Sequence, residues 1–321
     1  MEQSVCFLLL KNMQRIRTME ELCAELYTQE KIRGFLHLYI GEEAIATGVI
    51  SLLSASDNVL GTYREHGHAL LKGVSAKAIF SEMFGKIEGC SKGRGGSMHL
   101  YSVPHRFFGG NAIVASGIPQ AAGLAMAAKR LNEKRRTVCF FGEGAMCEGA
   151  FHETMNMTAL WNIPLLFCCE NNYYAMGTAL HRSQSQTDLV KKARSYAMEA
   201  ESVDGMNIFE VVEKTKTALD YIEHNQKPYF LEFKTYRFRP HSMFDPDLYR
   251  EKSEIEKWKR QDPIIFLKKE MTKSMNEIEM KQFTRDCENL NHEISVEMSE
   301  AIAFAEAARF ENFSEITIEG Q

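Results

Sequence analysis

Apolar positions recur every three or four residues at both ends of the chain, which is the spacing of one face of an α-helix. Between residues 4 and 33 they predict one amphipathic helix or two, with Phe7, Leu10, Met13, Ile16, Met19, Leu22 and Leu26 near one face. A long helix is predicted near the C-terminus from Phe283, Cys287, Leu290, Ile294, Met298, Ile302 and Ala305. We therefore expect helical segments over residues 1–33 and 251–321 that pack on a core or an interface and carry no chemistry.

The pattern changes in residues 137–178, where it predicts a strand, a glycine turn, a helix and a second strand. Residues 138–141 form a short apolar run that ends at Gly142-Glu143-Gly144. Residues 149–162 have helical spacing, with Phe151, Met155, Ala159 and Leu160 expected near one face, and residues 165–169 resemble a buried strand. Right-handed βαβ units have parallel strands, so Glu143 and Asn172 should leave the sheet at the same edge, where open α/β sheets bind ligands.

Shorter patterns predict the remaining elements. A helix should open at residues 41–43, a strand should cover 59–63, and a cluster of Arg and His over 64–68 follows that strand. Further helices are expected over 75–86, 117–129, 189–200 and 208–225, with a turn at 203–205 and a strand over 228–235. Residues 88–111 are rich in glycine and show no clear element, which is typical of functional or mobile loops. Alternating helices and strands indicate an α/β fold with a mostly parallel sheet.

The composition narrows the class of protein. The chain has 321 residues, 45% of them apolar, and a net charge of −5, which gives no reason to expect nucleic-acid or anionic-membrane binding. The eight cysteines include no C-x-x-C pair, so we expect reduced thiols in a cytosol-like compartment. No apolar run approaches membrane-spanning length, and the N-terminal residues resemble neither a signal nor a transit peptide. These features favour a cytoplasmic enzyme of bacterial type.

The chemistry of the central segment indicates a diphosphate cofactor. Glu143 and Asn172 offer hard oxygen ligands suited to Mg²⁺ or Ca²⁺. The backbone N–H groups of Gly144 and Ala145 are expected to open a helix, and a helix N-terminus favours phosphate. Gly-Glu-Gly, a spacer of 26 residues and then Asn-Asn resemble the thiamine pyrophosphate signature. A dinucleotide fold is the alternative, since Glu170 ends the second strand, but the glycines do not follow the G-x-G-x-x-G spacing.

Several motifs in fixed order resemble the alpha subunit of the thiamine-dependent dehydrogenases that act on 2-oxo acids. The resemblance covers about residues 8–270 and runs through HLYIGEEA, TYREHG, KGRGGSMH, GGNAIVASGIPQAAG, GEGAMCEG, ENNYYAMGT, VDGMN and TYRFRPHSMFDP. It implies an α/β thiamine pyrophosphate-binding fold, with a mostly parallel sheet flanked by helices, and one domain spanning residues 1–321.

The same resemblance implies roles for individual residues. Magnesium ligands would be Glu143, Asn172 and the backbone carbonyl of Tyr174. Thiamine pyrophosphate would contact Tyr63, Arg64, Ala112, Val114, Glu143, Gly144, Ala145, Asn172 and His241, with Arg64 pairing with the diphosphate. Histidines around the reacting carbon would be His37, His66 and His241, and histidine suits proton transfer near neutral pH.

The implied reaction is the oxidative decarboxylation of a 2-oxo acid, with transfer of the acyl group to a lipoyl group. The implied partners are a beta subunit, in an α2β2 heterotetramer, and a lipoyl-bearing acyltransferase of the same multienzyme complex. His37 and the GGSMHLY segment resemble pyruvate and acetoin dehydrogenases more than branched-chain ones, and pyruvate is the leading substrate. Glu143 replaces the usual aspartate and Pro240 a glycine, so a non-catalytic assembly subunit is a further alternative.

Overall fold

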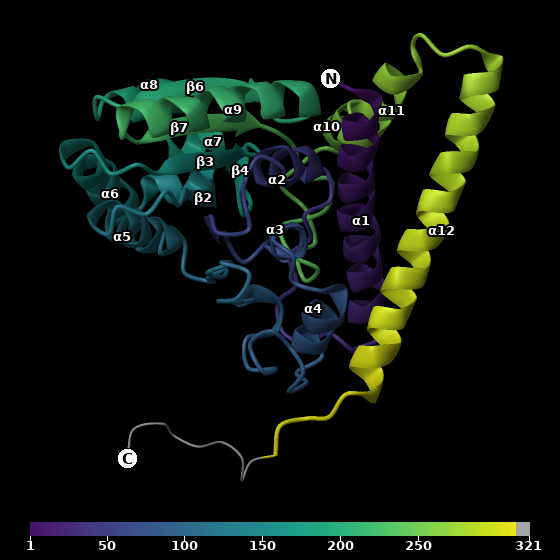
Figure 1. The fold of residues 1–321 in the computed structure, drawn as a ribbon. Coiled ribbons are helices and arrows are strands. Elements are labelled where there is room, and N and C mark those ends of the chain that lie inside the picture. Colours follow the sequence, from purple (N-terminus) through teal and green to yellow (C-terminus); the bar gives the residue numbers. More distant parts are fainter. Residues whose placement is uncertain (313–321) are drawn as a thin grey trace.

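A five-stranded parallel sheet forms the centre of the computed structural model, which describes residues 1–312 (Figure 1). The strand order is β1-β2-β3-β7-β6, and every neighbouring pair is parallel. The strands span β1 (Asn58–Leu60), β2 (Thr137–Gly142), β3 (Leu166–Asn171), β6 (Glu199–Asp204) and β7 (Tyr229–Lys234). Both α/β class and parallel sheet are therefore confirmed.

Both faces of the sheet are covered, because side chains alternate along each strand. In β2, Val138 and Phe140 join one hydrophobic cluster, whereas Cys139 and Phe141 join another on the opposite face. The first cluster includes residues of α2 (Glu43–Ile50) and α9 (Ile208–Asn225), and the second those of α5 (Gly117–Arg130), α6 (Gly149–Leu160) and α8 (Leu189–Arg194). The central strands are thus apolar on both faces, as expected of a parallel sheet.

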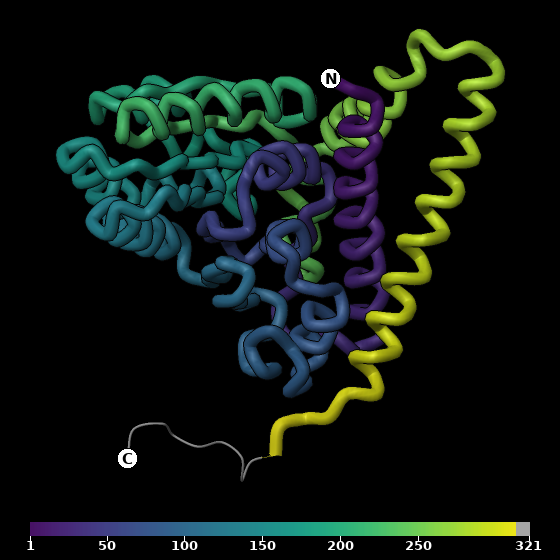
Figure 2. Tube along the Cα trace, in the orientation of Figure 1, coloured from purple at the N-terminus to yellow at the C-terminus, as the bar shows by residue number. Residues whose placement is uncertain are grey.

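Long helices pack beside this layered core. Helix α1 (Gln3–Thr28) and helix α12 (Glu277–Ala307) lie side by side, and α12 also packs on α4 (Ala76–Met83) (Figures 1 and 2). Arg15 of α1 donates to Glu297 of α12, with 2.9 Å between Nε and Oε2. Two further helices, α10 (Lys252–Lys259) and α11 (Pro263–Thr272), precede α12. The predicted terminal helices are confirmed within the described residues, and residues 313–321 of the predicted C-terminal segment lie outside them.

Short elements connect the larger ones. They are α3 (His66–Leu71), η1 (Gly96–Met98), η2 (Glu143–Cys147), β4 (Tyr174–Ala175), β5 (Thr178–Ala179) and α7 (Leu180–Ser183). Residues 88–111 contain only η1, as the glycine-rich pattern predicts. Among the residues that the structure describes, no helix is both long and apolar enough to cross a membrane. All eight cysteines are free thiols, in agreement with the prediction.

Several predicted boundaries were wrong. The helix predicted over 189–200 ends at Arg194, and strand β6 begins at Glu199 and continues to Asp204, into the predicted turn. Strand β1 ends at Leu60 rather than residue 63. Helix α6 buries Phe151 and Met155, but Leu160, the last residue of the helix, is 69% exposed. The turn after Gly142 is the 3₁₀ helix η2, so Gly144 and Ala145 precede α6 instead of opening it.

Candidate active site

A cavity lies at the carboxyl ends of β1, β2 and β3, where the sequence places the site. In the sheet register Gly142 pairs with Glu170, so the residues that follow these two strands emerge beside each other. Of the predicted residues, the cavity is lined by Tyr63, Arg64, Val114, Glu143, Gly144, Ala145, Asn172, Tyr174 and His241. These residues come from five segments that are separated in the sequence.

Glu143 and Asn172 have oxygen atoms free to bind a cation. Glu143 is buried and its Oε1 has no hydrogen-bond partner within the chain. Burial is the main cause that raises the pKa of Glu143 to about 7. The Oδ1 of Asn172 has only long contacts, at 3.4 Å from the amide nitrogen of Tyr174 and 3.5 Å from Nη1 of Arg237. A buried carboxylate oxygen without a partner is costly, and a hard divalent cation fits this donor set.

Two buried guanidinium groups supply positive charge at the same cavity. Arg64 donates to the backbone oxygens of Leu38 at 2.7 Å and His241 at 2.8 Å. Arg237 also lines the cavity, and its Nη2 lies 3.0 Å from the hydroxyl of Tyr249. Burial and the neighbouring Arg237 lower the pKa of Arg64. Guanidinium groups suit phosphate oxygens, so this side of the cavity is suited to an anion.

Three aromatic rings meet beside Arg64. The ring centroid of His37 lies 4.4 Å from that of Tyr63 and 4.8 Å from that of His241. Burial and then the charge of Arg64 lower the pKa of His37 well below its usual range, and the same causes lower the pKa of His241 to about 3. Lowered pKa values favour the neutral form of both imidazoles, which offers one ring nitrogen as a hydrogen-bond acceptor and the other as a donor. His37 contacts the lining residues but does not itself line the cavity.

The segment after Arg239-Pro240 is held by polar contacts. The amide of His241 donates to Asp245 Oδ2 at 3.0 Å, and the Tyr249 hydroxyl donates to the same carboxylate at 2.7 Å. Arg250 donates to the backbone oxygen of Arg239 at 3.0 Å. Proline removes one backbone donor, at position 240, and these contacts still fix His241 at the cavity.

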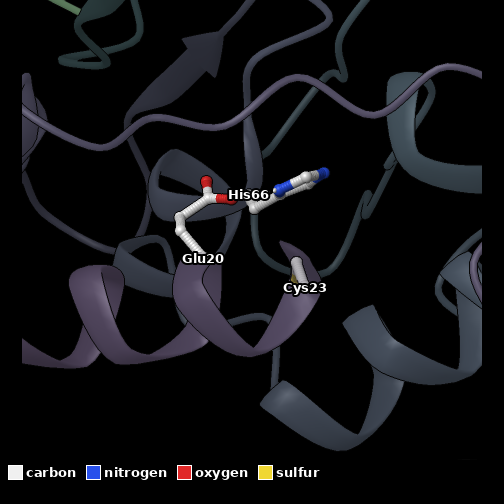
Figure 3. Close-up of side chains that lie close together, drawn as sticks. All are labelled: Glu20, Cys23 and His66. Atoms are coloured by element: carbon white, nitrogen blue, oxygen red, sulfur yellow. Dashed lines mark hydrogen bonds and ion pairs between the residues drawn. The ribbon is translucent and has the colours of Figure 1, made fainter. Parts of the chain in front are cut away.

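His66, which the resemblance places near the reacting carbon, is not among the residues that line the cavity. Its Nδ1 is 3.0 Å from Oε2 of Glu20 in α1 (Figure 3). Its Nε2 is 2.8 Å from Oγ of Ser97 in η1. Glu20, Cys23 and His66 offer metal-ligand atoms within 4.8 Å of one another and are all buried. Both ring nitrogens of His66 are already hydrogen-bonded. These two hydrogen bonds connect α1 and η1 to the start of α3.

Other residues at the cavity differ from the prediction. Ala112 is exposed and does not line it, although its neighbours Asn111 and Ile113 do. Sequence reasoning missed Glu42 and Arg237, which are buried and line the cavity. A signal existed for both, because they lie within HLYIGEEA and TYRFRPHSMFDP, two of the segments that carry the resemblance.

Comparison with known proteins agrees with this geometry. Residues 11–314 match the family described as the dehydrogenase E1 component. A relative from Porphyra purpurea, named pyruvate dehydrogenase E1 component subunit alpha, is 42% identical over 307 residues, or 94% of this chain and 88% of the relative. A relative of the same name from Rickettsia felis is 39% identical over 298 residues, covering 92% and 89%. The chloroplastic alpha-3 subunit of Arabidopsis thaliana is 42% identical over 300 residues, covering 91% and 68%. The predicted family is confirmed, and the chain belongs to the dehydrogenase E1 component family.

Proposed function

We propose that this chain is the alpha subunit of a pyruvate dehydrogenase, which oxidatively decarboxylates pyruvate and transfers the acetyl group to a lipoyl group. Relatives that match over about nine tenths of the chain carry this name. The observation that supports catalysis most is the buried Glu143 oxygen without a partner, in a cavity that Asn172 and two guanidinium groups also line. A subunit that only assembled a complex would have no need of such a costly arrangement.

The family uses thiamine pyrophosphate, and we propose that Mg²⁺ joins it here. Glu143, Asn172 and the backbone carbonyl of Tyr174 would hold the metal ion. Arg64 and the backbone N–H groups of Gly144 and Ala145 would bind the diphosphate, and Tyr63 and Val114 would flank the organic part. When bound, the cofactor supplies the carbon nucleophile and accepts the electrons released on decarboxylation.

The histidines of this chain serve the reaction in two ways in this proposal. His241 lines the cavity and His37 packs on it, so both neutral rings can hold or move a proton near the reacting atoms. Arg64 fixes His241 through the backbone oxygen of that residue. His66 does not line the cavity, and in this proposal it holds the segment that carries Tyr63 and Arg64, through Glu20 and Ser97.

A set of exposed apolar side chains, here called the apolar rim, supports a protein partner; three of them line the cavity. It consists of the exposed side chains Ile113, Val114, Met176, Phe244 and Leu248, which come from three loops that also contribute lining residues or lie next to them. We propose that a beta subunit covers this rim in an α2β2 heterotetramer and completes the site. A lipoyl-bearing acyltransferase would then accept the acyl group. One domain over residues 1–321 and a cytoplasmic location complete the proposal; two relatives are named chloroplastic.

The test is turnover by this chain together with a beta-type subunit. The complex is assayed with an artificial electron acceptor, thiamine pyrophosphate and Mg²⁺, with pyruvate, 2-oxoisovalerate and acetoin compared side by side. We expect turnover of pyruvate that requires both subunits and the metal ion. Preference for acetoin or 2-oxoisovalerate would reassign the substrate, and a stable complex without turnover would support an assembly role. Glu143→Ala should abolish metal-dependent cofactor binding while the thermal unfolding profile of the unliganded chain stays cooperative.

A further inference from the structure

Glu42 is a buried carboxylate at the cavity for which neither the sequence nor the relatives give a role. It is 1% exposed and precedes helix α2, but its side chain makes no capping hydrogen bond to that helix. The neighbouring Glu43 carries the structural contacts, because it accepts from Arg17 and from the amide of Gly41. Glu42 turns the other way and lines the cavity.

The contact of Glu42 with the proposed metal ligand is specific. Nδ2 of Asn172 donates to Oε1 of Glu42 at 3.1 Å. Oε2 of Glu42 makes no hydrogen bond, and its nearest cation is Nε of Arg64 at 3.8 Å. Glu42 therefore contacts one side chain through a hydrogen bond, and that side chain carries the oxygen offered to the metal ion.

The hydrogen bond from Asn172 to Glu42 influences which way the side-chain amide of Asn172 is turned. An asparagine side chain presents an oxygen acceptor and an NH₂ donor of nearly the same shape, and its hydrogen bonds decide which of them faces a ligand. Around Asn172, Glu42 is an acceptor, whereas Arg237 and the amide of Tyr174 are donors. Only one orientation satisfies all three, with Nδ2 on Glu42 and Oδ1 turned toward the cavity side. Reversing the amide would present NH₂ to a cation.

We propose that Glu42 is a positioning residue that fixes the amide of Asn172, so that Oδ1 is presented to the metal ion. This inference rests on the metal site of the proposed function. Partners of metal ligands commonly change metal affinity by about 10- to 100-fold when they are removed. Glu42 would act on metal binding through Asn172, without touching the metal ion.

Glu232 provides a matched control, because its asparagine partner, Asn171, is the residue before Asn172. Glu232 is also buried, and its Oε1 accepts from Nδ2 of Asn171 at 2.7 Å. This pair repeats the carboxylate–asparagine contact of Glu42 and Asn172, but neither Glu232 nor Asn171 lines the cavity. If loss of any buried carboxylate weakened metal binding, variants of Glu42 and Glu232 would lose affinity equally. If Glu42 positions the metal ligand, only the Glu42 variant should lose affinity.

The experiment measures Mn²⁺ affinity by electron paramagnetic resonance in the full chain co-purified with its beta-type subunit, at saturating thiamine pyrophosphate. We expect Glu42→Ala to weaken Mn²⁺ binding about 10- to 100-fold. Glu42→Gln keeps an oxygen acceptor for Asn172 but loses the charge facing Arg64, and it should stay within about 3-fold of wild type. Glu232→Ala should leave the affinity unchanged. Glu42→Leu, which fills the space without an acceptor, replaces Glu42→Ala if that variant fails to fold.

A double-mutant cycle of Glu42→Ala with Asn172→Asp tests whether Glu42 acts through the orientation of the Asn172 amide. In an Asn172→Asp background both oxygens of residue 172 can bind a cation, so Glu42→Ala should no longer weaken Mn²⁺ binding. Equal losses for Glu42→Ala and Glu232→Ala, or an unchanged affinity in Glu42→Ala, would overturn the positioning role. An equal loss in Glu42→Gln would assign the effect to charge and would also overturn it. If wild type fails to bind Mn²⁺ with the cofactor, the proposed function fails instead, which the wild-type titration alone reveals.

Discussion

Gly144 approaches another backbone segment so closely that a single methyl group should disturb the site. A Cβ atom at Gly144 would lie 2.6 Å from Cβ of Ala175 and 3.5 Å from its Cα. Carbon atoms are at their optimum at about 3.5–4.0 Å, so the two methyl groups would be about 1 Å too close. Overpacking of this kind costs about 1–3 kcal/mol. Because Ala175 follows Tyr174 in β4, Gly144→Ala should also displace a proposed metal ligand and weaken cofactor binding.

Removing the opposing methyl group should reverse the effect. In the double variant Gly144→Ala/Ala175→Gly the nearest remaining atom is the Cα at 3.5 Å, which is an ordinary contact. Ala175→Gly alone should cost about 0.5–1 kcal/mol through the added flexibility of glycine. The double variant should therefore be about 1–2 kcal/mol more stable than the sum of the single changes predicts. Thermal unfolding measures this coupling, at roughly 2 °C per kcal/mol in a chain of this size.

Gly123 in helix α5 controls for the substitution itself. A Cβ there meets nothing within 4 Å and the residue is exposed, so Gly123→Ala should stabilise the chain by about 0.5–1 kcal/mol. Additive effects at Gly144 and Ala175, or a fully stable Gly144→Ala with unchanged cofactor binding, would refute the steric argument. The same outcome would mean that the spacing of Gly-Glu-Gly serves the backbone turn and not this contact.

Three further predictions concern single groups. Iodoacetamide should label Cys147 first in the native chain, because Cys147 is exposed and five other thiols are buried. Peptide mass spectrometry measures the order of labelling, and early labelling of a buried thiol would contradict its burial in the fold. Burial and Arg64 lower the pKa of His241 to about 3, so its ring should stay neutral from pH 5 to 8 in the unliganded chain, and an NMR midpoint between pH 6 and 7 would refute this. Arg17→Met leaves the buried Glu43 without its counter-ion and should cost about 3–5 kcal/mol, and a denaturation midpoint equal to wild type would exclude that role.

Local rules were sufficient for the centre of the fold. Strand, glycine turn, helix and strand can be read in residues 137–178, and the parallel rule then places Glu143 and Asn172 at one edge. Helix α9 agrees with its predicted bounds because Asn207 caps its first turn and the apolar positions keep helical spacing up to Ile222. The sequence determined these features because each depends on neighbours along the chain.

The features that the sequence did not predict have physical causes of two kinds. Strand β6 lies at the edge of the sheet, where Ala200 and Val203 are buried while the charged Glu199 is exposed, so its composition does not look strand-like. The second kind depends on contacts between distant segments. His66 meets Glu20 across 46 positions of sequence, and no pattern local to either residue predicts that pairing.

The cavity itself shows why a site can be located from sequence more easily than its inner contacts. Folding alone favours pairing every buried polar atom, yet Oε1 of Glu143, Oε2 of Glu42 and Nδ1 of His37 lack hydrogen-bond partners within the chain. These three atoms lie at or next to the cavity that Arg64 lines, whereas other unpartnered buried atoms, such as Oγ of Ser81, do not line it. Such groups weaken the fold unless a ligand satisfies them, so they are retained where binding outweighs stability. Sequence patterns reflect what stabilises the fold. They therefore predict the strands and the edge of the sheet at which the site lies. The orientation of Asn172 by Glu42 belongs to binding, and three-dimensional contacts are needed to see it.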